Sequence, residues 1–557
     1  MEGKELMIIG NMGDKFYNYF YAEDMETNQR KINLEGKEWK KQRATTTTSK
    51  HTEEVFMNLI PRDDWYLPEV LRAKQEELQK LKLWKTYELV PDNDEFRISV
   101  TWVVWWKGEL VRARLVARGF EERNSLPKDS PTAERVSILF IVCLAVGMKW
   151  ILRVDNVSSA FLQGEELERT VHLAPPKELE GGKGKLMLLR TCIYGLADAS
   201  LQWWKKLSKE IRKLGCEQSH LDPALYIKKD KNGHLEGALC SHVDDLLSCG
   251  TEKFEKEVIE KLRKIFKMGD PTFKDLTYIG LQMKQTKEGV IISQDDFVEK
   301  KVEPQEVTMA RRNKPEEKLT KEENRLYRKL VGWLGWVSSG TRPDLSFTRV
   351  ELSTHFKQAR VRDLVLAVKT INHLKGQKSF FKIPQELGHP NDWWLELSTD
   401  GSEANLGVKS TRGFILLLRG KGTATAPLAW SSNKIQKVCT SSLMAEAIAA
   451  ERALGEAMYV RQLMAQILGR NEKDIRLEIL TDNMSLLDNV ISNKANDDKR
   501  YRVNIAVIKQ ALEEEEVDEI RWIDGSDMLA DVLTKAGAIK KKLKNVMETG
   551  RRFPKDV

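Results

Sequence analysis

Alternating apolar and polar stretches are clearest in the last 165 or so residues of the chain. Three strand-like runs (WWLELSTDG, TRGFILLLRG and APLAWSSN) come before a long helical pattern. Ser441 or Ser442 can cap that helix, and its apolar face runs through Leu443, Ala447, Ala450, Leu454 and Met458. A strand RLEILTD, helical segments, a strand DEIRWID and a basic helix follow. This order predicts an α/β domain over residues 391–557.

The first half of the chain predicts a mixed α and β structure. The stretch PEVLRAKQEELQKLKLW is typical of a helix, with apolar residues at roughly helical spacing at Val70, Leu71, Leu78, Leu81 and Leu83. Two strand-like runs follow, SVTWVVWWKGEL and VRARLVARGF, joined by a turn at 107–109. In the first of them Trp102, Val104 and Trp106 alternate, as in a half-buried strand. Residues 131–151 predict a buried helix, and short strand and helix signals alternate from 151 to 303.

Composition shifts divide the chain into four segments. Residues 1–60 are polar and end in the basic, threonine-rich stretch KKQRATTTTSKH, which is typical of a flexible arm or a fragment of an upstream domain. Residues 304–325 are charged and poor in apolar side chains, so we expect a linker there. A helical region to about 383 follows, and QELGHPND marks the next boundary. The expected units are 1–60, 61–303, 304–390 and 391–557.

Composition narrows the class of protein only slightly. The 557 residues carry a formal net charge of +8, which permits a polyanionic partner without requiring one. The six cysteines include no CxxC pair, so reduced single thiols are expected rather than a zinc site. The N-terminus lacks the layout of a signal peptide, and no apolar run approaches the roughly 20 residues of a membrane span. We therefore expect a cytoplasmic or nuclear protein that is not secreted and does not contact a membrane.

Two sets of carboxylates could hold divalent metal ions for chemistry on phosphate. Such chemistry needs acids that converge from separate elements, because two metals must stabilise the attacking and leaving oxygens. Asp244 and Asp245 lie in CSHVDDLLSCG, where a strand–turn–strand hairpin would carry them at its tip. Two solvated turn acids would give the same local pattern.

The second set is Asp400, Glu446, Asp482 and Asp531. Asp400 and Asp482 each end an apolar strand, Glu446 lies one turn into the long helix, and Asp531 lies in the helical stretch SDMLADVLTK. Ligand sites in α/β sheets usually lie at such element ends. Acids are also common there without a metal.

From about Trp84 to Lys535 the chain resembles the reverse transcriptase and ribonuclease H of copia-type retrotransposons. The resemblance rests on a colinear series of strings: VRARLVARGFEE, SSAFLQGEEL, LRTCIYGLADASLQWWKKL, HVDDLL, YIGLQM, GVIISQDDFV, LVGWLGWVSSGTRPDLSF, STDGS, AWSSNKIQ, SSLMAEAIA, LTDN and LADVLTK. It implies an α+β fold, with right-hand polymerase fingers and palm, a connecting helical region and an α/β ribonuclease H-like domain. It also implies RNA-directed DNA synthesis and cleavage of the RNA strand of RNA–DNA hybrids.

The resemblance assigns roles to individual residues. Asp244 and Asp245 become catalytic palm acids that bind metal, and Asp155 is taken as the third because it is the only acid near the position of the family aspartate. Asp400, Glu446, Asp482 and Asp531 become the ribonuclease H metal ligands. Arg114 falls where basic residues of the fingers meet the incoming triphosphate, although a solvated strand charge would fit its position too. The implied cofactor is Mg²⁺, two ions per site, with Mn²⁺ able to substitute. The implied partners are an RNA template, a DNA primer, the RNA–DNA hybrid and deoxynucleoside triphosphates.

The chain departs from the family pattern in several motifs. His242 replaces the usual tyrosine before VDD, and Ala197-Asp198 replaces Lys-Gln after YGL. In the first catalytic motif the family aspartate lies four residues before the alanine of AFL, a position held here by Asn156, with Asp155 beside it. Strand alternation would turn Asp155 to the opposite face, whereas a β-bulge would let it reach the metals. A decayed, non-catalytic relic that still binds nucleic acid is therefore the alternative to an active enzyme.

Overall fold

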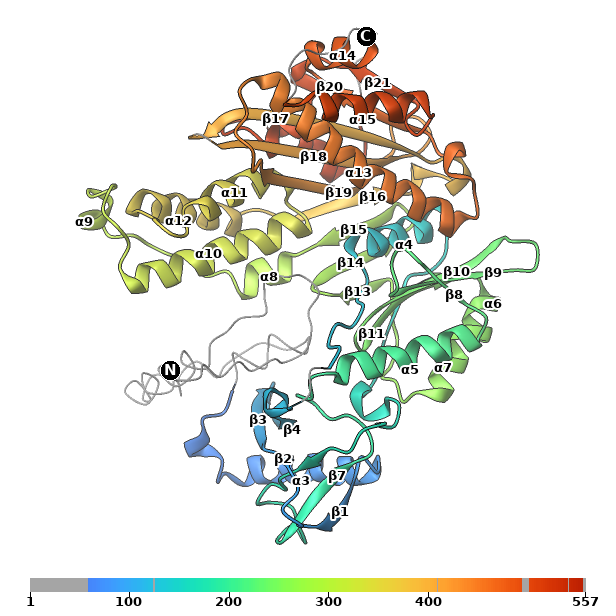
Figure 1. The fold of residues 1–557 in the computed structure, drawn as a ribbon, viewed down its shortest axis with the longest axis vertical. Coiled ribbons are helices and arrows are strands. Elements are labelled where there is room, and N and C mark those ends of the chain that lie inside the picture. Colours follow the sequence, from blue (N-terminus) through green and yellow to red (C-terminus); the bar gives the residue numbers. More distant parts are fainter. Residues whose placement is uncertain (1–58, 124–125, 408, 493–499, 539, 554–557) are drawn as a thin grey trace.

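A computed structural model of the chain describes residues 59–123, 126–407, 409–492, 500–538 and 540–553 (Figure 1). Of the arm expected over residues 1–60, all but the last two residues lie outside the described residues. The backbone N–H of Ile60 donates to the Val104 carbonyl at 2.8 Å, and the Ile60 side chain is buried. Ile60 thus belongs to the folded part of the chain.

The N-terminal lobe combines one long helix with two small sheets. Its elements are α3 (Pro68–Leu83), the hairpin β3 (Val100–Lys107) and β4 (Leu110–Ala117), and a sheet of order β1-β7-β6-β2 made of Tyr87–Pro91, Lys185–Leu189, His172–Leu173 and Arg97–Ile98. The expected helix and hairpin are confirmed. The buried face of α3 contains fewer residues than predicted, because Leu71 and Leu83 are exposed.

A six-stranded central sheet follows, with strand order β12-β5-β11-β10-β9-β8. In chain order its strands are β5 (Arg153–Asn156), β8 (Glu217–Gln218), β9 (Leu225–Lys229), β10 (Leu235–His242), β11 (Asp245–Gly250) and β12 (Thr272–Phe273). Helix α4 (Arg135–Gly147), the buried helix expected over 131–151, packs on one face. The other face carries α5 (Ala199–Lys213) and the continuous helical segment of α6 (Glu252–Phe254), a π-helical turn (Glu255–Ile259) and α7 (Glu260–Ile265).

A second sheet and a helical bundle connect the central sheet to the C-terminal part. The sheet contains β13 (Asp275–Tyr278), β14 (Leu281–Thr286), β15 (Gly289–Ser293) and β16 (Phe380–Pro384). The bundle contains α8 (Asp295–Lys300), α9 (Met309–Arg312), α10 (Lys321–Gly340), α11 (Ser346–Thr354) and α12 (Val361–Lys375).

Two expectations for this region need correction. The segment expected as a linker contains α9 and the start of α10, which a Thr320–Glu323 capping box fixes. Residues 380–384 form a strand that pairs with β15, not the end of a helix.

The C-terminal sheet has five strands in the order β19-β18-β17-β20-β21. They are β17 (Trp394–Leu406), β18 (Lys409–Arg419), β19 (Thr425–Lys434), β20 (Leu477–Thr481) and β21 (Glu519–Trp522). Strands β17, β18 and β19 are antiparallel, and β20 and β21 run parallel to β17. The helices are α13 (Ser442–Leu468), α14 (Met484–Ile491), α15 (Arg502–Glu513) and α16 (Lys541–Thr549). The predicted order is confirmed, and Ser441 is the N-cap of α13.

One hydrophobic core joins the central and C-terminal sheets. Every residue of α4 from 136 to 146 is buried, because the helix packs against β10 and β11 on one side and against β19 and α13 on the other. A polar contact crosses the same boundary, where the Tyr459 hydroxyl donates to the Glu134 carboxylate at 2.8 Å. The Trp430 indole N–H on β19 donates to the Ser338 carbonyl on α10 at 2.8 Å and ties the C-terminal sheet to the helical bundle. The two sheets are therefore held by packing rather than joined only through a linker. Within the described residues, no helix is both long and apolar enough to cross a membrane.

Candidate active sites

The first acid pair lies at the tip of the β10–β11 hairpin, as the sequence predicts. His242 pairs with Asp245 across a two-residue turn of Val243 and Asp244. Val243 has a φ of +54°, a backbone conformation that is strained for a β-branched residue. The indole N–H of the buried Trp203 donates to the Val243 carbonyl at 2.6 Å, and the Val157 amide donates to the Asp244 carbonyl at 2.7 Å. These bonds hold the turn that presents the acids.

Asn156 is the third residue of this site. Strand β5 pairs with β11 in unbroken register, and Asn156 lies opposite Asp245. The Asn156 amide nitrogen donates to Asp245 Oδ1 at 2.7 Å and lies 3.5 Å from Asp244 Oδ2. The site therefore combines two carboxylates with one neutral amide.

Asp155 does not reach these acids, which corrects its expected placement as a metal ligand. The regular pairing of β5 leaves no bulge, so the Asp155 side chain points to the other face of the sheet. It is only 1% exposed, and its oxygens accept bonds from Arg153 Nε at 2.5 Å, Arg153 Nη2 at 2.9 Å and Arg263 Nη1 at 2.5 Å. Asp155 thus neutralises the buried Arg153 and the half-buried Arg263. No local pattern in the sequence pointed to Arg263, which comes from α7.

The surroundings of Asp244 connect the hairpin to the N-terminal lobe. The Arg114 guanidinium lies 4.5 Å from the ring centre of Tyr194 and 5.4 Å from that of Trp105. Burial raises the pKa of Asp244, while Arg114 and the Asn156 amide act in the opposite direction. Burial also lowers the pKa of the nearby His242, so this imidazole favours its neutral form. Arg114 therefore belongs to the electrostatic environment of the hairpin acids.

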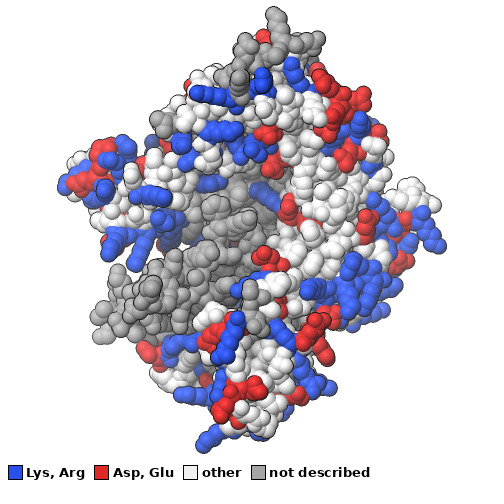
Figure 2. Space-filling model, viewed as in Figure 1, with Lys and Arg blue, Asp and Glu red and all other residues white. Residues whose placement is uncertain are grey.

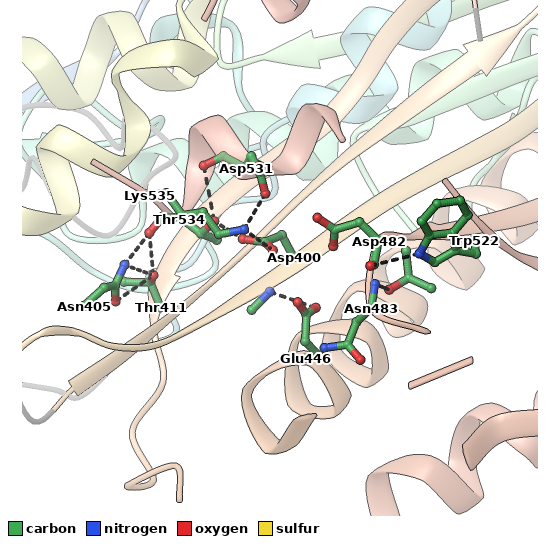
Figure 3. Close-up of polar contacts among 12 residues, drawn as sticks. Asp400, Asn405, Thr411, Glu446, Asp482, Asn483, Trp522, Asp531, Thr534 and Lys535 are labelled. Carbon is green, nitrogen blue, oxygen red and sulfur yellow. Dashed lines mark hydrogen bonds and ion pairs between the residues drawn. The ribbon is translucent and has the colours of Figure 1, made fainter. Parts of the chain in front are cut away.

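The second acid set converges at one end of the C-terminal sheet (Figure 3). Oxygens of Asp400, Asp482 and Asp531 lie within 4.8 Å of one another. Asp400 projects from β17, Asp482 follows β20, and Asp531 lies in a short 3-10 helix, Leu529–Leu533. Strands β17 and β20 pair in parallel as far as Ser398 and Leu480, and Asp400 and Asp482 each come two residues after this paired segment, which brings the two acids together. Three of the four acids predicted from this half of the chain therefore form one cluster.

Glu446 lies beside this cluster on α13. Its Oε2 accepts a hydrogen bond from the Gly401 backbone N–H at 3.0 Å. A side chain at Gly401 would place its Cβ 2.4 Å from the Ala445 backbone, so glycine is what lets α13 approach β17 so closely. Burial, followed by the charges of Asp400 and Asp482, raises the pKa of Glu446 well above its ordinary value. Burial also raises the pKa values of Asp482 and Asp531, the latter to about 6.

Sequence reasoning did not single out two further residues of this site. The Lys535 ammonium lies 3.1 Å from Asp400 Oδ1 and 2.6 Å from Asp531 Oδ1, and the Thr534 hydroxyl donates to Asp400 Oδ2. The signal for Lys535 was present, because a lysine four residues after an aspartate is placed to pair with it. Thr534 carried no comparable signal.

The donor set of the C-terminal cluster suits a hard divalent cation. Mg²⁺ prefers carboxylate oxygens, and here three aspartates from separate elements supply them around one point. Burial and mutual repulsion raise the pKa values of several of these acids, so a bound cation would relieve an unfavourable charge cluster. The hairpin site has fewer charges to offer, with Asp244, Asp245 and the amide of Asn156.

Known proteins are similar to most of this chain. Residues 84–316 match the family model described as reverse transcriptase (RNA-dependent DNA polymerase). The retrovirus-related Pol polyprotein from transposon TNT 1-94 of Nicotiana tabacum is 26% identical over 506 residues, which cover 84% of this chain and 36% of that protein. The Pol polyprotein from transposon RE1 of Arabidopsis thaliana is 25% identical over 408 residues, 69% of this chain and 27% of that protein. The chain thus spans about a quarter to a third of these relatives.

A solved structure supports the fold. The foamy viral protease-reverse transcriptase in complex with double-stranded DNA matches with a TM-score of 0.50 at 13% identity, covering 82% of this chain and 70% of that one. By this likeness the chain has the mixed α and β fold of a retroviral reverse transcriptase. Its central sheet, which carries Asp244 and Asp245, lies within the family match. Residues 84–316 thus match the reverse transcriptase family model, and the chain is similar to the retrovirus-related Pol polyproteins of plant transposons.

Proposed function

We propose that this chain is the reverse transcriptase and ribonuclease H part of a copia-type Pol polyprotein, and that the ribonuclease H site is the more robust of its two active sites. The convergence of Asp400, Asp482 and Asp531 on one point carries the proposal. The order of the C-terminal sheet supports a ribonuclease H-like fold for residues 391–557. The substrate is the RNA strand of an RNA–DNA hybrid.

In this proposal the chain's own residues hold and orient the reacting groups. Asp400, Asp482, Asp531 and Glu446 would bind two Mg²⁺ ions, or Mn²⁺ in their place, which when bound neutralise the charge on the attacking and leaving oxygens of the phosphate. Glu446 also ties α13 to β17 through its bond to Gly401. The Thr534 hydroxyl holds Asp400 Oδ2 by a hydrogen bond.

The test is cleavage of a labelled RNA–DNA hybrid with Mg²⁺ or Mn²⁺. Asp482→Asn removes one charge from the cluster without changing its shape, so we expect cutting to be abolished while the melting temperature (Tm) stays close to that of the parent. Asp488→Asn, at an exposed aspartate on the neighbouring α14, is the matched control and should cut normally. Full activity in Asp482→Asn would refute the assignment.

We propose weak DNA synthesis at the hairpin site. Asp244 and Asp245 would hold the metals, Arg114 would meet the triphosphate, and Asn156 would stand in place of the family aspartate. This substitution also favours a second candidate, a decayed relic that binds nucleic acid without catalysis. Hybrid cleavage distinguishes the two, because a relic would bind the hybrid but leave its RNA uncut.

The surface charge fits a polyanionic partner. Lys and Arg side chains gather over α5 and α7 at the right of Figure 2, and the exposed basic residues of these helices include Lys205, Lys209, Arg212, Lys261 and Lys264. Contacts to phosphate position a nucleic acid without reading its sequence. The proposed partners are RNA template, DNA primer, their hybrid and deoxynucleoside triphosphates, and the proposed location is the cytoplasm, in virus-like particles, or the nucleus.

A further inference from the structure

A cation of the chain itself lies within the C-terminal acid cluster. Lys535 Nζ bridges Asp400 Oδ1 at 3.1 Å and Asp531 Oδ1 at 2.6 Å, so one ammonium pairs with two of the three clustered aspartates (Figure 3). Asp400 is fully buried, and the acids near it repel one another. The ammonium therefore offsets charge where the cluster has least access to water.

The chain positions Lys535 by a short and specific segment. The Lys535 backbone N–H donates to the Asp531 carbonyl at 2.9 Å, which closes one helical turn and brings the two side chains to the same side. The carbonyl of the preceding Thr534 accepts a bond from the Thr411 hydroxyl at 3.0 Å, which ties the segment to β18. The backbone at Lys535 is thus anchored, whereas its side chain is 40% exposed and has room to turn outward.

Both oxygens of Asp400 are engaged by the chain, one by Lys535 and the other by Thr534. Mg²⁺ binds its oxygen ligands at roughly 2.1 Å. An ion held by Asp400 Oδ1 and Asp531 Oδ1 would lie close to the position of the ammonium, and two cations cannot share that position. Of the two donors to Asp400, Thr534 is buried, so Lys535 is the one that can leave.

We propose that Lys535 is a built-in competitor of the divalent metal, neutralising Asp400 and Asp531 until a metal displaces it. This inference rests on the proposed function of the cluster as a metal site. It implies that the ammonium stabilises the acids in the absence of metal. It also implies that the apparent dissociation constant for metal rises, because metal binds only the fraction of molecules in which the ammonium has left.

The test is Lys535→Met, which keeps much of the length of the side chain and removes its charge. Mn²⁺ binding is measured by electron paramagnetic resonance or calorimetry, without substrate. We expect the dissociation constant for Mn²⁺ to fall roughly 5- to 10-fold. This corresponds to a metal-free parent in which the lysine has left the acids in only about a tenth to a fifth of the molecules. In EDTA the Tm of the variant should fall below that of the parent, and saturating Mn²⁺ should close the gap.

Two controls separate the possible failures. Lys542→Met removes a lysine of similar exposure, 44%, that pairs with Asp527 outside the cluster, and it should leave Mn²⁺ binding unchanged. Asp482→Asn should abolish Mn²⁺ binding at the cluster. If the parent binds no Mn²⁺ that Asp482→Asn removes, the proposed function itself fails. If the parent binds it, but Lys535→Met binds it equally well or more weakly, or keeps the parent's Tm in EDTA, only the competitor role is refuted.

Discussion

Replacing Asn156 by aspartate should strengthen the weak polymerase activity that we propose for this chain. The amide nitrogen of Asn156 lies 2.7 Å from Asp245 Oδ1 and 3.5 Å from Asp244 Oδ2. Asn156→Asp changes the shape of the site very little and adds a third negative charge. Because β5 and β11 pair without a bulge, the new carboxylate should point to the same side as the present amide.

The size of the effect follows from charges at these distances. With water-like screening, repulsion between the new carboxylate and its two neighbours would cost about 1.5 and about 1.2 kcal/mol. Attraction to a divalent ion at roughly 2.1 Å would contribute about 4 kcal/mol under the same screening. The repulsion acts with and without metal and cancels from the binding free energy, so the attraction of about 4 kcal/mol sets the upper limit and metal affinity should rise at least roughly tenfold. The same repulsion should lower the Tm of the variant when EDTA removes metal.

Primer extension over a series of Mg²⁺ or Mn²⁺ concentrations measures this change. We expect the variant to extend primers at least about tenfold faster than the parent at sub-saturating metal. Asn232→Asp, in an exposed turn, is the control for an added charge. Asp155→Asn should instead destabilise the fold by about 3–5 kcal/mol, because it leaves Arg153 buried with one partner fewer. If the parent extends primers as well as Asn156→Asp does, Asn156 does not weaken the site. If Asp155→Asn abolishes extension at an unchanged Tm, Asp155 acts in catalysis and not in the stability of the fold.

Three other measurements address the rest of the molecule. Ending the chain at residue 387 removes β19 and α13 from one side of α4, so the truncated protein should aggregate; a soluble monomer in size-exclusion chromatography would contradict the shared core. Burial and the charge of Asp400 raise the pKa of Asp531 to about 6, although the bond from Lys535 opposes this. The acid must be ionised to bind metal, so hybrid cleavage should fall as the pH drops through about 6, and undiminished cleavage at pH 5 would argue against its role. Binding to hybrid duplex should weaken roughly 10³-fold or more between 50 and 200 mM salt if it uses 6–10 phosphate contacts, and a flat titration would argue against such contacts.

Local patterns predicted most of the secondary structure. The helix α13 and the β3–β4 hairpin depend on residues close in sequence and were confirmed, and of the two serines predicted as the cap of α13 the structure selects Ser441. The strand β16 could not be predicted in this way, because its five residues have no clear alternation and form a strand by pairing with β15, about 90 residues earlier.

The choice between Asp155 and Asn156 shows a different limit of the sequence. Regular alternation and a β-bulge were both compatible with the local residues. The structure distinguishes them in two ways. Strand β5 pairs with β11 without a bulge, and Arg263, more than 100 residues later in the sequence, donates a hydrogen bond to the Asp155 carboxylate. Lys535 was overlooked for a simpler reason. A lysine four residues after an aspartate, as Lys535 is after Asp531, is typical of an exposed ion pair on a helix. Only the fold brings Asp400 to the same ammonium.

The packing of α4 between two sheets has a consequence for a long substrate that reaches both sites. If the central and C-terminal sheets cannot turn independently, the stretch of duplex between the hairpin acids and the C-terminal acids has a constant length. The molecule would then act as a ruler, and each nucleotide added at one end would advance the cut by one nucleotide at the other. RNA fragments formed during synthesis should share one narrow length distribution, and substitutions at the Glu134–Tyr459 contact should broaden it.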